Sequence, residues 1–233
     1  MRYPISIQTF ETIRKGGYVY VDKTDLVYDL AQEHVCFLSR PRRFGKSLLI
    51  STLEAYFQGR AELFSGLKME QLEKNWEKHP IFHIDFSRGE YSNSDELKDV
   101  LEEYLLRWEQ EWGKDSCALT LSGRFESLLR RANEKTSHKA VVLIDEYDKP
   151  LLDALGKDQE NANRDILRGF YGTFKAADAS LRFVLLTGVT KFSQISVFSG
   201  FNQPNDISMN RKFDAICGIT EEELHTVFAE PIA

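Results

Sequence analysis

The chain has 233 residues, of which 42% are hydrophobic and 28% charged, enough to build one sizeable α/β core. Its formal net charge of −6 argues against a generally basic surface for nucleic acid. No stretch approaches the ~20 apolar residues that cross a bilayer, and the first residues lack the apolar core of a signal peptide, so we expect a cytoplasmic protein without membrane contact.

The first segment precedes any nucleotide motif. Residues 8–14 predict a short helix, residues 18–21 a short strand after a Gly-Gly turn, and residues 24–32 a helix capped by Asp22 or Thr24. We assign residues 1–34 to an N-terminal segment that packs on the core.

The next segment has the order of a nucleotide phosphate-binding loop. An apolar run at residues 35–38 leads into a short polar loop, and a helical pattern follows at residues 48–53. Strand, tight loop and helix N-terminus aim backbone N–H groups at a phosphate, and a lysine adds a formal charge. The predicted nucleotide-binding residues of this loop are Arg40, Pro41, Arg42, Arg43, Phe44, Gly45, Lys46, Ser47 and Leu48.

The loop departs from the usual pattern at its first position, which is Arg40 instead of glycine. Because Arg40 precedes Pro41, its backbone is pushed toward extended geometry, and the loop must turn differently. The tripeptide Gly45, Lys46 and Ser47 stays in register with the pattern, although alone it is weak evidence. The arginines around it favour phosphate or carboxylate contacts over nucleic-acid contacts.

A second motif lies far along the chain, where residues 140–144 form an apolar run that ends in two acids. The run is too short for a helix and predicts a buried parallel strand that delivers carboxylates. Asp145 is placed to hold Mg2+ opposite the Ser47 hydroxyl, and Glu146 to polarise the water that attacks the γ-phosphate. The alternative is that the two acids merely end a strand beside a helix. Asp148 is expected to cap the helix that follows, and the alternative is that it supports the acidic pair.

The remaining elements alternate between strands and helices. Strand patterns occupy residues 81–86 and 181–186, and helical faces lie within residues 97–112, 125–132 and 160–177. This alternation predicts an α/β P-loop NTPase fold with a mostly parallel sheet, an inserted strand between the two nucleotide motifs, and helices on both faces. We assign residues 35–219 to this core.

Two further features follow the last core strand. Thr187 stands at its carboxyl end and is our first choice for a residue that senses the γ-phosphate or orients water, ahead of Thr190 and Lys191. Thr220 and Glu223 have the side chains of a capping box, so we expect residues 220–233 to begin a truncated C-terminal helical lid.

Cysteine and histidine usage gives no sign of a disulfide or a transition metal. The three cysteines are odd in number and widely spaced among apolar residues, which is typical of free thiols in a reducing compartment. The five histidines show no paired ligand spacing with cysteine or acid. Mg2+ that accompanies a nucleotide is the only metal we expect.

Several segments together resemble the bacterial AAA-ATPase-like family over nearly the whole chain. They are IQTFETIR at residues 7–14, YVYVDKT at 18–24, FLSRPRRFGKS at 37–47, LIDEYD at 143–148 and TGVTKFS at 187–193. In that family arginine occupies the first loop position, as Arg40 does here. Its members usually continue into a helical segment and often a restriction-type nuclease domain, so nucleic acid is an expected partner only through that missing domain.

The resemblance implies a P-loop ATPase with ATP and Mg2+ as cofactors. Lys46 would bind the β- and γ-phosphates, Ser47 and Asp145 would hold Mg2+, and Glu146 would be the catalytic base. Three residues before the loop would border the adenine, namely Tyr20, Asp22 and Lys23, although core packing is an equal alternative for Tyr20.

Two functions of different class remain open. One is an ATPase that drives a C-terminal module missing from this chain, and the other is a nucleotide-binding switch or scaffold with little hydrolysis. A homo-oligomer is possible, with Arg182 or Arg211 acting across its interface. The rate of ATP turnover separates the two functions.

Overall fold

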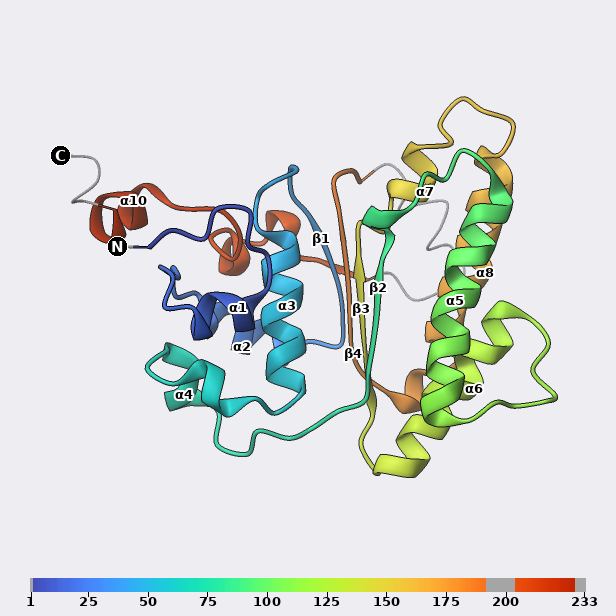
Figure 1. Ribbon diagram of the computed structural model, residues 1–233, viewed down its shortest axis with the longest axis horizontal. Helices are drawn as coiled ribbons and strands as arrows, with labels where there is room; N and C mark the ends of the chain where they lie inside the picture. The colour runs from blue at the N-terminus through green and yellow to red at the C-terminus, as the bar shows by residue number, and fades with distance from the viewer. Residues whose placement is uncertain (1, 192–203, 229–233) are drawn as a thin grey trace.

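A five-stranded parallel sheet lies at the centre of the structure, with the strand order β2-β3-β4-β1-β5 (Figure 1). This computed structural model describes residues 2–191 and 204–228. The strands are β1 (Val35–Ser39), β2 (Ile81–Asp85), β3 (Ala140–Asp145), β4 (Leu181–Gly188) and β5 (Asn205–Asp206). All six residues of β3 are buried, as expected for a strand covered on both faces.

Because the strands are parallel, both nucleotide motifs lie at the carboxyl ends of the strands. β4 lies between β1 and β3, with Leu38 opposite Thr187 and Ile144 opposite Leu186. The strand that separates the motifs in space is therefore β4, whereas β2, which separates them along the chain, lies at the sheet edge beside β3. The predicted α/β P-loop NTPase fold with a parallel sheet is confirmed.

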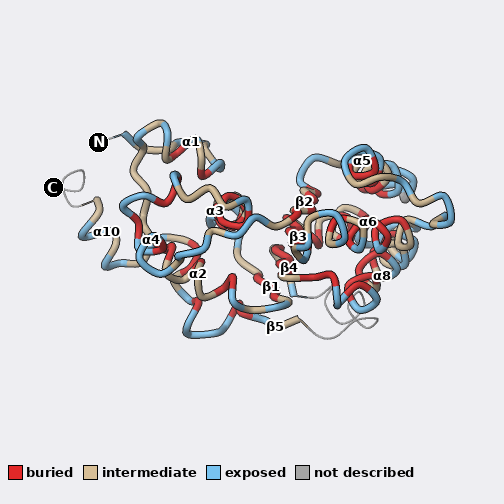
Figure 2. Tube along the Cα trace, turned by 90° about the horizontal axis from the view of Figure 1, so that it is seen from below, coloured by how far each residue is buried: buried red, intermediate tan, exposed pale blue. Residues whose placement is uncertain are grey.

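One face of the sheet is covered by the N-terminal helices (Figure 2). These are α1 (Phe10–Lys15), α2 (Thr24–Ala31), α3 (Lys46–Phe57) and α4 (Lys68–Leu72). Cys36 and Leu38 of β1 point into this cluster, while Phe37 between them points into the cluster on the other face. This alternation is the period of a strand, and it lets one short strand contribute to two cores.

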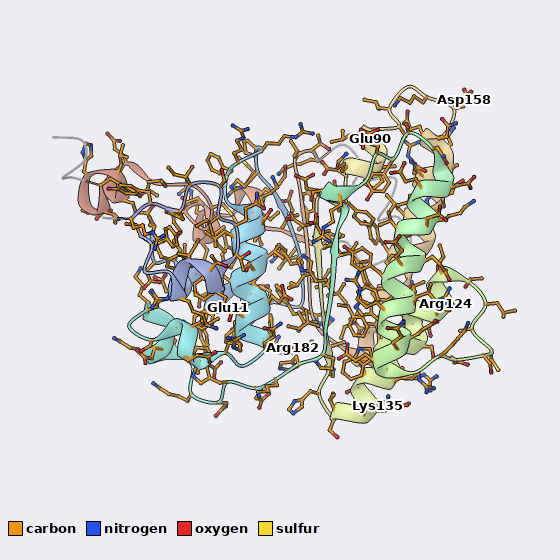
Figure 3. The ribbon with its side chains drawn as sticks, viewed as in Figure 1. Glu11, Glu90, Arg124, Lys135, Asp158 and Arg182 are labelled. Atoms are coloured by element: carbon orange, nitrogen blue, oxygen red, sulfur yellow. The ribbon has the colours of Figure 1, made fainter. Side chains whose placement is uncertain are left out.

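The other face is covered by three longer helices, α5 (Ser94–Trp112), α6 (Leu121–Thr136) and α8 (Glu160–Ala176). Phe125 of α6 stacks on Phe170 of α8 with ring centroids 4.6 Å apart. The buried Arg124 guanidinium joins α6 to α5 by donating to Glu109 at 2.7 Å and to Glu102 (Figure 3). The helices predicted from the apolar faces of these segments are confirmed.

The remaining elements of the described residues are short. They are α7 (Lys149–Leu152), α10 (Glu221–Val227) and the 3-10 turns Ala61–Phe64, Phe86–Arg88, Asp178–Ser180, Ile207–Met209 and Arg211–Phe213. The capping box predicted for Thr220 and Glu223 is present at the start of α10. Among the described helices none is both long and apolar enough to cross a bilayer.

The predicted strand at residues 18–21 does not form. The backbone N–H of Val19 donates to the carbonyl of Arg2 at 2.8 Å instead of to a strand of the sheet. A β-branched run forms a strand only where a sheet edge accepts it, and here Tyr20 packs against the cluster of the N-terminal helices instead.

Candidate nucleotide site

The loop between β1 and α3 turns through two left-handed residues. Arg43 has φ 61° and Gly45, which caps the N-terminus of α3, has φ 88° and ψ 14°. Glycine adopts this conformation without the Cβ clash that other residues suffer. Within residues 2–191 and 204–228, no side chain caps the first turn of α3, so its N–H groups face the loop without a side-chain acceptor from that part of the chain. An uncapped helix N-terminus of this kind suits a phosphate.

Lys46 lies at the centre of this turn and is only 5% exposed. Its Nζ donates to the carbonyls of Arg40 at 3.1 Å and Pro41 at 3.2 Å, so the loop curls around the ammonium group. Among the described residues no carboxylate forms an ion pair with Lys46. A buried ammonium that has only neutral acceptors gains from an added anion, and phosphate oxygens supply one.

The three arginines of the loop have different surroundings. The Arg40 guanidinium turns away and donates to the carbonyls of Ser39 at 3.0 Å and Ser208 at 2.7 Å, which fastens residues 207–209 beneath the loop. Arg42 and Arg43 are exposed and form no ion pair with any described residue. The predicted phosphate contacts of all three stay predictions, and Arg40 has a structural role through its side chain.

Residues from α3, from β4 and from the turn after β3 converge on the carboxylate of Asp145, which is 4% exposed at the end of β3. Ser47 on α3 donates to its Oδ2 at 2.6 Å, and Thr187 on β4 donates to its Oδ1 at 2.5 Å. The backbone N–H of Glu146 also reaches Oδ1, at 3.1 Å. Hydroxyl and carboxylate oxygens are the donors that Mg2+ prefers, so this set fits the ion. Thr187 is fully buried and its hydroxyl points at Asp145, not into the loop.

Glu146 follows Asp145 with the left-handed φ of 54°, which is uncommon for a residue with a Cβ. Its carboxyl is half-buried. Burial raises the pKa of Glu146, and the neighbouring charge of Asp145 raises it further, while Lys46 and Arg42 act in the opposite direction. A carboxylate whose pKa moves toward neutrality is better suited to accept a proton from water.

Asp148 has a different role from the helix cap that we expected. Its side chain makes no capping bond to α7. Instead Oδ2 accepts from the backbone N–H groups of Val189 at 2.9 Å and Thr190 at 2.7 Å, and from the Thr190 hydroxyl at 2.9 Å. The capping prediction is therefore wrong, because Asp148 has the helical backbone angles φ −90° and ψ −13° instead of the extended ones from which a side chain caps a helix. Of the segment at residues 187–193, Phe192 and Ser193 lie outside the described residues.

The C-terminal part of the described chain covers the loop from one side. The N–H of Gly218 donates to the carbonyl of Phe44 at 3.0 Å, and Gly218 has φ 81°. Lys23 is 8% exposed and donates to the Ala215 carbonyl and, at 2.9 Å, to Glu223 on α10. Sequence reasoning missed these contacts, and its only available signal was Gly218 just before the capping box.

The other residues predicted to border the adenine are engaged with the chain itself. Asp22 accepts from the backbone N–H of Thr24 at 3.0 Å and, with its second oxygen, from that of Lys68 at 2.9 Å, which ties α2 to α4. The Tyr20 ring packs edge-on against Phe10 at 5.2 Å, and burial raises the pKa of its hydroxyl. These contacts give Tyr20, Asp22 and Lys23 structural roles, and their contact with a base stays a prediction.

Comparison with known proteins bears on the same site. The family described as "Predicted AAA-ATPase" matches residues 4–198, a range that contains the loop, Asp145, Glu146 and Thr187. A protein of Azotobacter chroococcum mcd 1, described as "Uncharacterized protein in vnfD 5'region", is 42% identical over 234 residues that cover 98% of this chain. The chain spans 45% of the length of that relative.

Proposed function

Since the chain belongs to the predicted AAA-ATPase family and is a nucleotide-binding ATPase-like domain, we propose that it hydrolyses ATP in a Mg2+-dependent reaction. The observation that carries this proposal is the 2.6 Å hydrogen bond between Ser47 and Asp145. These residues lie 98 positions apart, and each is the predicted metal ligand of its own motif. Their meeting at one point beside the buried Lys46 supports a single triphosphate site.

In this proposal the chain's own groups divide the work of phosphoryl transfer. The N–H groups of the first turn of α3 and the Lys46 ammonium hold the β- and γ-phosphates. Ser47 and Asp145 would hold Mg2+, and the ion would supply positive charge that offsets the charge of the triphosphate. Glu146 takes a proton from the attacking water, and Thr187 keeps the Asp145 carboxylate in its orientation.

We further propose that hydrolysis moves a C-terminal module that this chain does not contain. The support is twofold: the relative from Azotobacter chroococcum is more than twice as long as the matched region, and the Phe44 carbonyl touches the segment that leads into α10. Contact with nucleic acid would belong to that module. In a homo-oligomer Arg211 is the better candidate to reach the nucleotide site of a neighbouring subunit. Arg182 is less suitable because it stands at the start of β4 and its guanidinium lies over the Phe57 ring.

Steady-state ATP hydrolysis tests the proposal. The chain should turn over ATP with Mg2+ and stop when the metal is chelated. Glu146→Gln should bind ATP but lose about 10²–10⁴-fold in rate, the range typical of a lost general base. Lys46→Ala should lose ATP binding.

Matched controls are the exposed Glu126→Gln and Lys175→Ala, which make the same chemical changes away from the site. Unchanged ATP affinity in Lys46→Ala would contradict the phosphate loop. Equal and negligible rates in the wild type and Glu146→Gln, with ATP still bound, would favour the switch or scaffold without hydrolysis.

A further inference from the structure

Three side chains able to bind a metal meet at the edge of the sheet where the strands begin, opposite the nucleotide site. They are Glu77, His79 and His138, and one ligand atom from each lies within 4.8 Å of the other two. This edge is at the lower end of β2 and β3 in Figure 1, and Figure 3 labels Arg182 and Lys135 near it. Sequence spacing did not reveal the cluster, because the two histidines precede different strands that lie far apart in the chain.

Strand register explains why the two histidines meet. β2 begins at Ile81 and β3 at Ala140, so each histidine lies two positions before its strand. Because Ile81 pairs with Val141 in parallel register, the segments that enter the two strands run side by side. The two imidazole rings pack edge-on with centroids 5.5 Å apart.

The His79 ring is held in the tautomer that a metal ligand needs. Its Nδ1 lies 2.9 Å from the carbonyl oxygen of Lys139, and a carbonyl can only accept, so Nδ1 carries the proton. The lone pair is then on Nε2. A carbonyl that accepts from one ring nitrogen, and so orients the other toward the metal, is a recurring feature of metal-binding histidines. The His79 backbone is also fixed, since its N–H donates to the Phe57 carbonyl at 2.8 Å.

The lone pair of His79 faces another acceptor. Nε2 lies 3.9 Å from the Glu77 carboxylate, so two electron-pair donors face each other without a hydrogen between them when His79 is neutral. A cation bound to both atoms would accept both electron pairs and remove the repulsion between them.

We propose that Glu77, His79 and His138 bind one Zn2+ ion, with water in the fourth position. Two imidazoles and one carboxylate are a donor set that Zn2+ prefers, and tetrahedral bonds of about 2.0–2.1 Å separate the ligand atoms by about 3.3 Å. The 3.9 Å gap between His79 and Glu77 closes with a small rotation of the exposed Glu77 side chain. His138 is half-buried, and no described residue hydrogen-bonds its ring nitrogens.

The ion would fasten the segment before β2 to the turn between α6 and β3. This position is independent of the nucleotide chemistry, because Asp145 lies at the far end of β3, about 20 Å away at ~3.3 Å per residue. The expected role is to hold the edge strand β2 in register with β3. The inference therefore stands or falls separately from ATP hydrolysis.

Zinc titration of the intact chain against a chromophoric chelator tests the site. One Zn2+ per chain should bind, and His138→Gln and Glu77→Gln should each weaken binding by at least about tenfold. Both side chains are partly exposed, so these variants should keep the fold, which circular dichroism checks. The control is His34→Gln, because His34 is an exposed histidine directly before β1 that contacts Asp178; this variant should bind Zn2+ as the wild type does.

Two more measurements distinguish a specific metal site from adventitious binding. The wild type should show the intense visible bands of tetrahedral Co2+, and these bands should be lost in His138→Gln. Zn2+ should raise the melting temperature of the wild type and of His34→Gln, but not of His138→Gln. Binding that is equally strong in His138→Gln and Glu77→Gln, or an octahedral Co2+ spectrum, would mean an adventitious ion only and would overturn the proposal.

Discussion

The N–H of Gly218 donates to the Phe44 carbonyl at 3.0 Å, and this bond joins the phosphate loop to the segment that leads into α10. The ring of Phe44 also lies against Gly218, where a Cβ would be only 2.6 Å from the ring atom Cε1. These contacts connect the loop to the segment before α10, and Glu223 in α10 is in turn paired with Lys23 at 2.9 Å.

Gly218→Ala tests this contact. The new Cβ must displace the Phe44 ring, and φ of 81° adds the left-handed cost of about 1–2 kcal/mol. We expect lower stability in urea and weaker ATP binding. Gly156→Ala is the matched control, because Gly156 has φ 73° but no atom within 4 Å of its Cβ position. Equal losses of stability and ATP affinity in the two variants would show that the Phe44 contact contributes to neither property.

Glu146 predicts a specific dependence on pH. Its folded pKa lies above the ordinary value of 4.5, so the folded chain holds this proton more tightly than the unfolded chain. The stabilisation that the protonated Glu146 carboxyl contributes is complete below the ordinary pKa and is lost as pH rises through the folded pKa. Glu146→Gln should therefore be more stable than the wild type at neutral pH, and this advantage should vanish below pH 4.5.

The same titration should appear in catalysis. Because the proposed base works only when deprotonated, wild-type turnover should rise with pH through the raised pKa of Glu146. Urea unfolding and ATP hydrolysis measured over one pH series check both expectations. A wild type that is more stable than Glu146→Gln at neutral pH would contradict the role of burial at this carboxyl.

Thr187→Val tests whether the Thr187 hydroxyl orients Asp145, because the substitution leaves the packing of the core nearly unchanged. Valine fills nearly the same volume but removes the hydroxyl that donates to Asp145 Oδ1. We expect a loss of about 1–3 kcal/mol from the poorly satisfied buried carboxylate. Half-maximal ATP hydrolysis should also need more Mg2+. Thr173→Val is the control, since Thr173 is buried on α8 and donates to the Ser122 carbonyl at 3.4 Å, away from the site.

Asp148 should stabilise the turn after β4 through its hydrogen bonds. Asp148→Ala removes the acceptor of three hydrogen bonds and should lower the free energy of unfolding by about 2 kcal/mol or more. Asp148→Asn keeps an oxygen at the same place and should lose less. The order wild type, Asn, Ala in urea midpoint is the expected result, and similar losses in both variants would argue that charge, not the acceptor, matters.

Much of the fold follows from local pattern. The apolar run of β3 is buried along its whole length, and the apolar faces of α5 and α6 cover the sheet as their periodicity predicts. Such patterns can be read locally because burial selects residues at the period of each element. The failed strand at residues 18–21 shows the limit, since pairing depends on a neighbour that local sequence does not specify.

The candidate site divides in the same way. From sequence alone came the two motifs and the roles expected of Lys46, Ser47, Asp145 and Glu146, because a phosphate loop and an acidic strand end place chemistry-bearing residues at fixed local positions.

Only the tertiary structure decided which groups meet. It placed β4 between the motifs, turned Arg40 toward the Ser208 carbonyl, laid Gly218 on Phe44 and brought His79 beside His138. These contacts join segments far apart in the chain, and they depend on how whole surfaces pack. No periodicity or spacing within a segment records that packing.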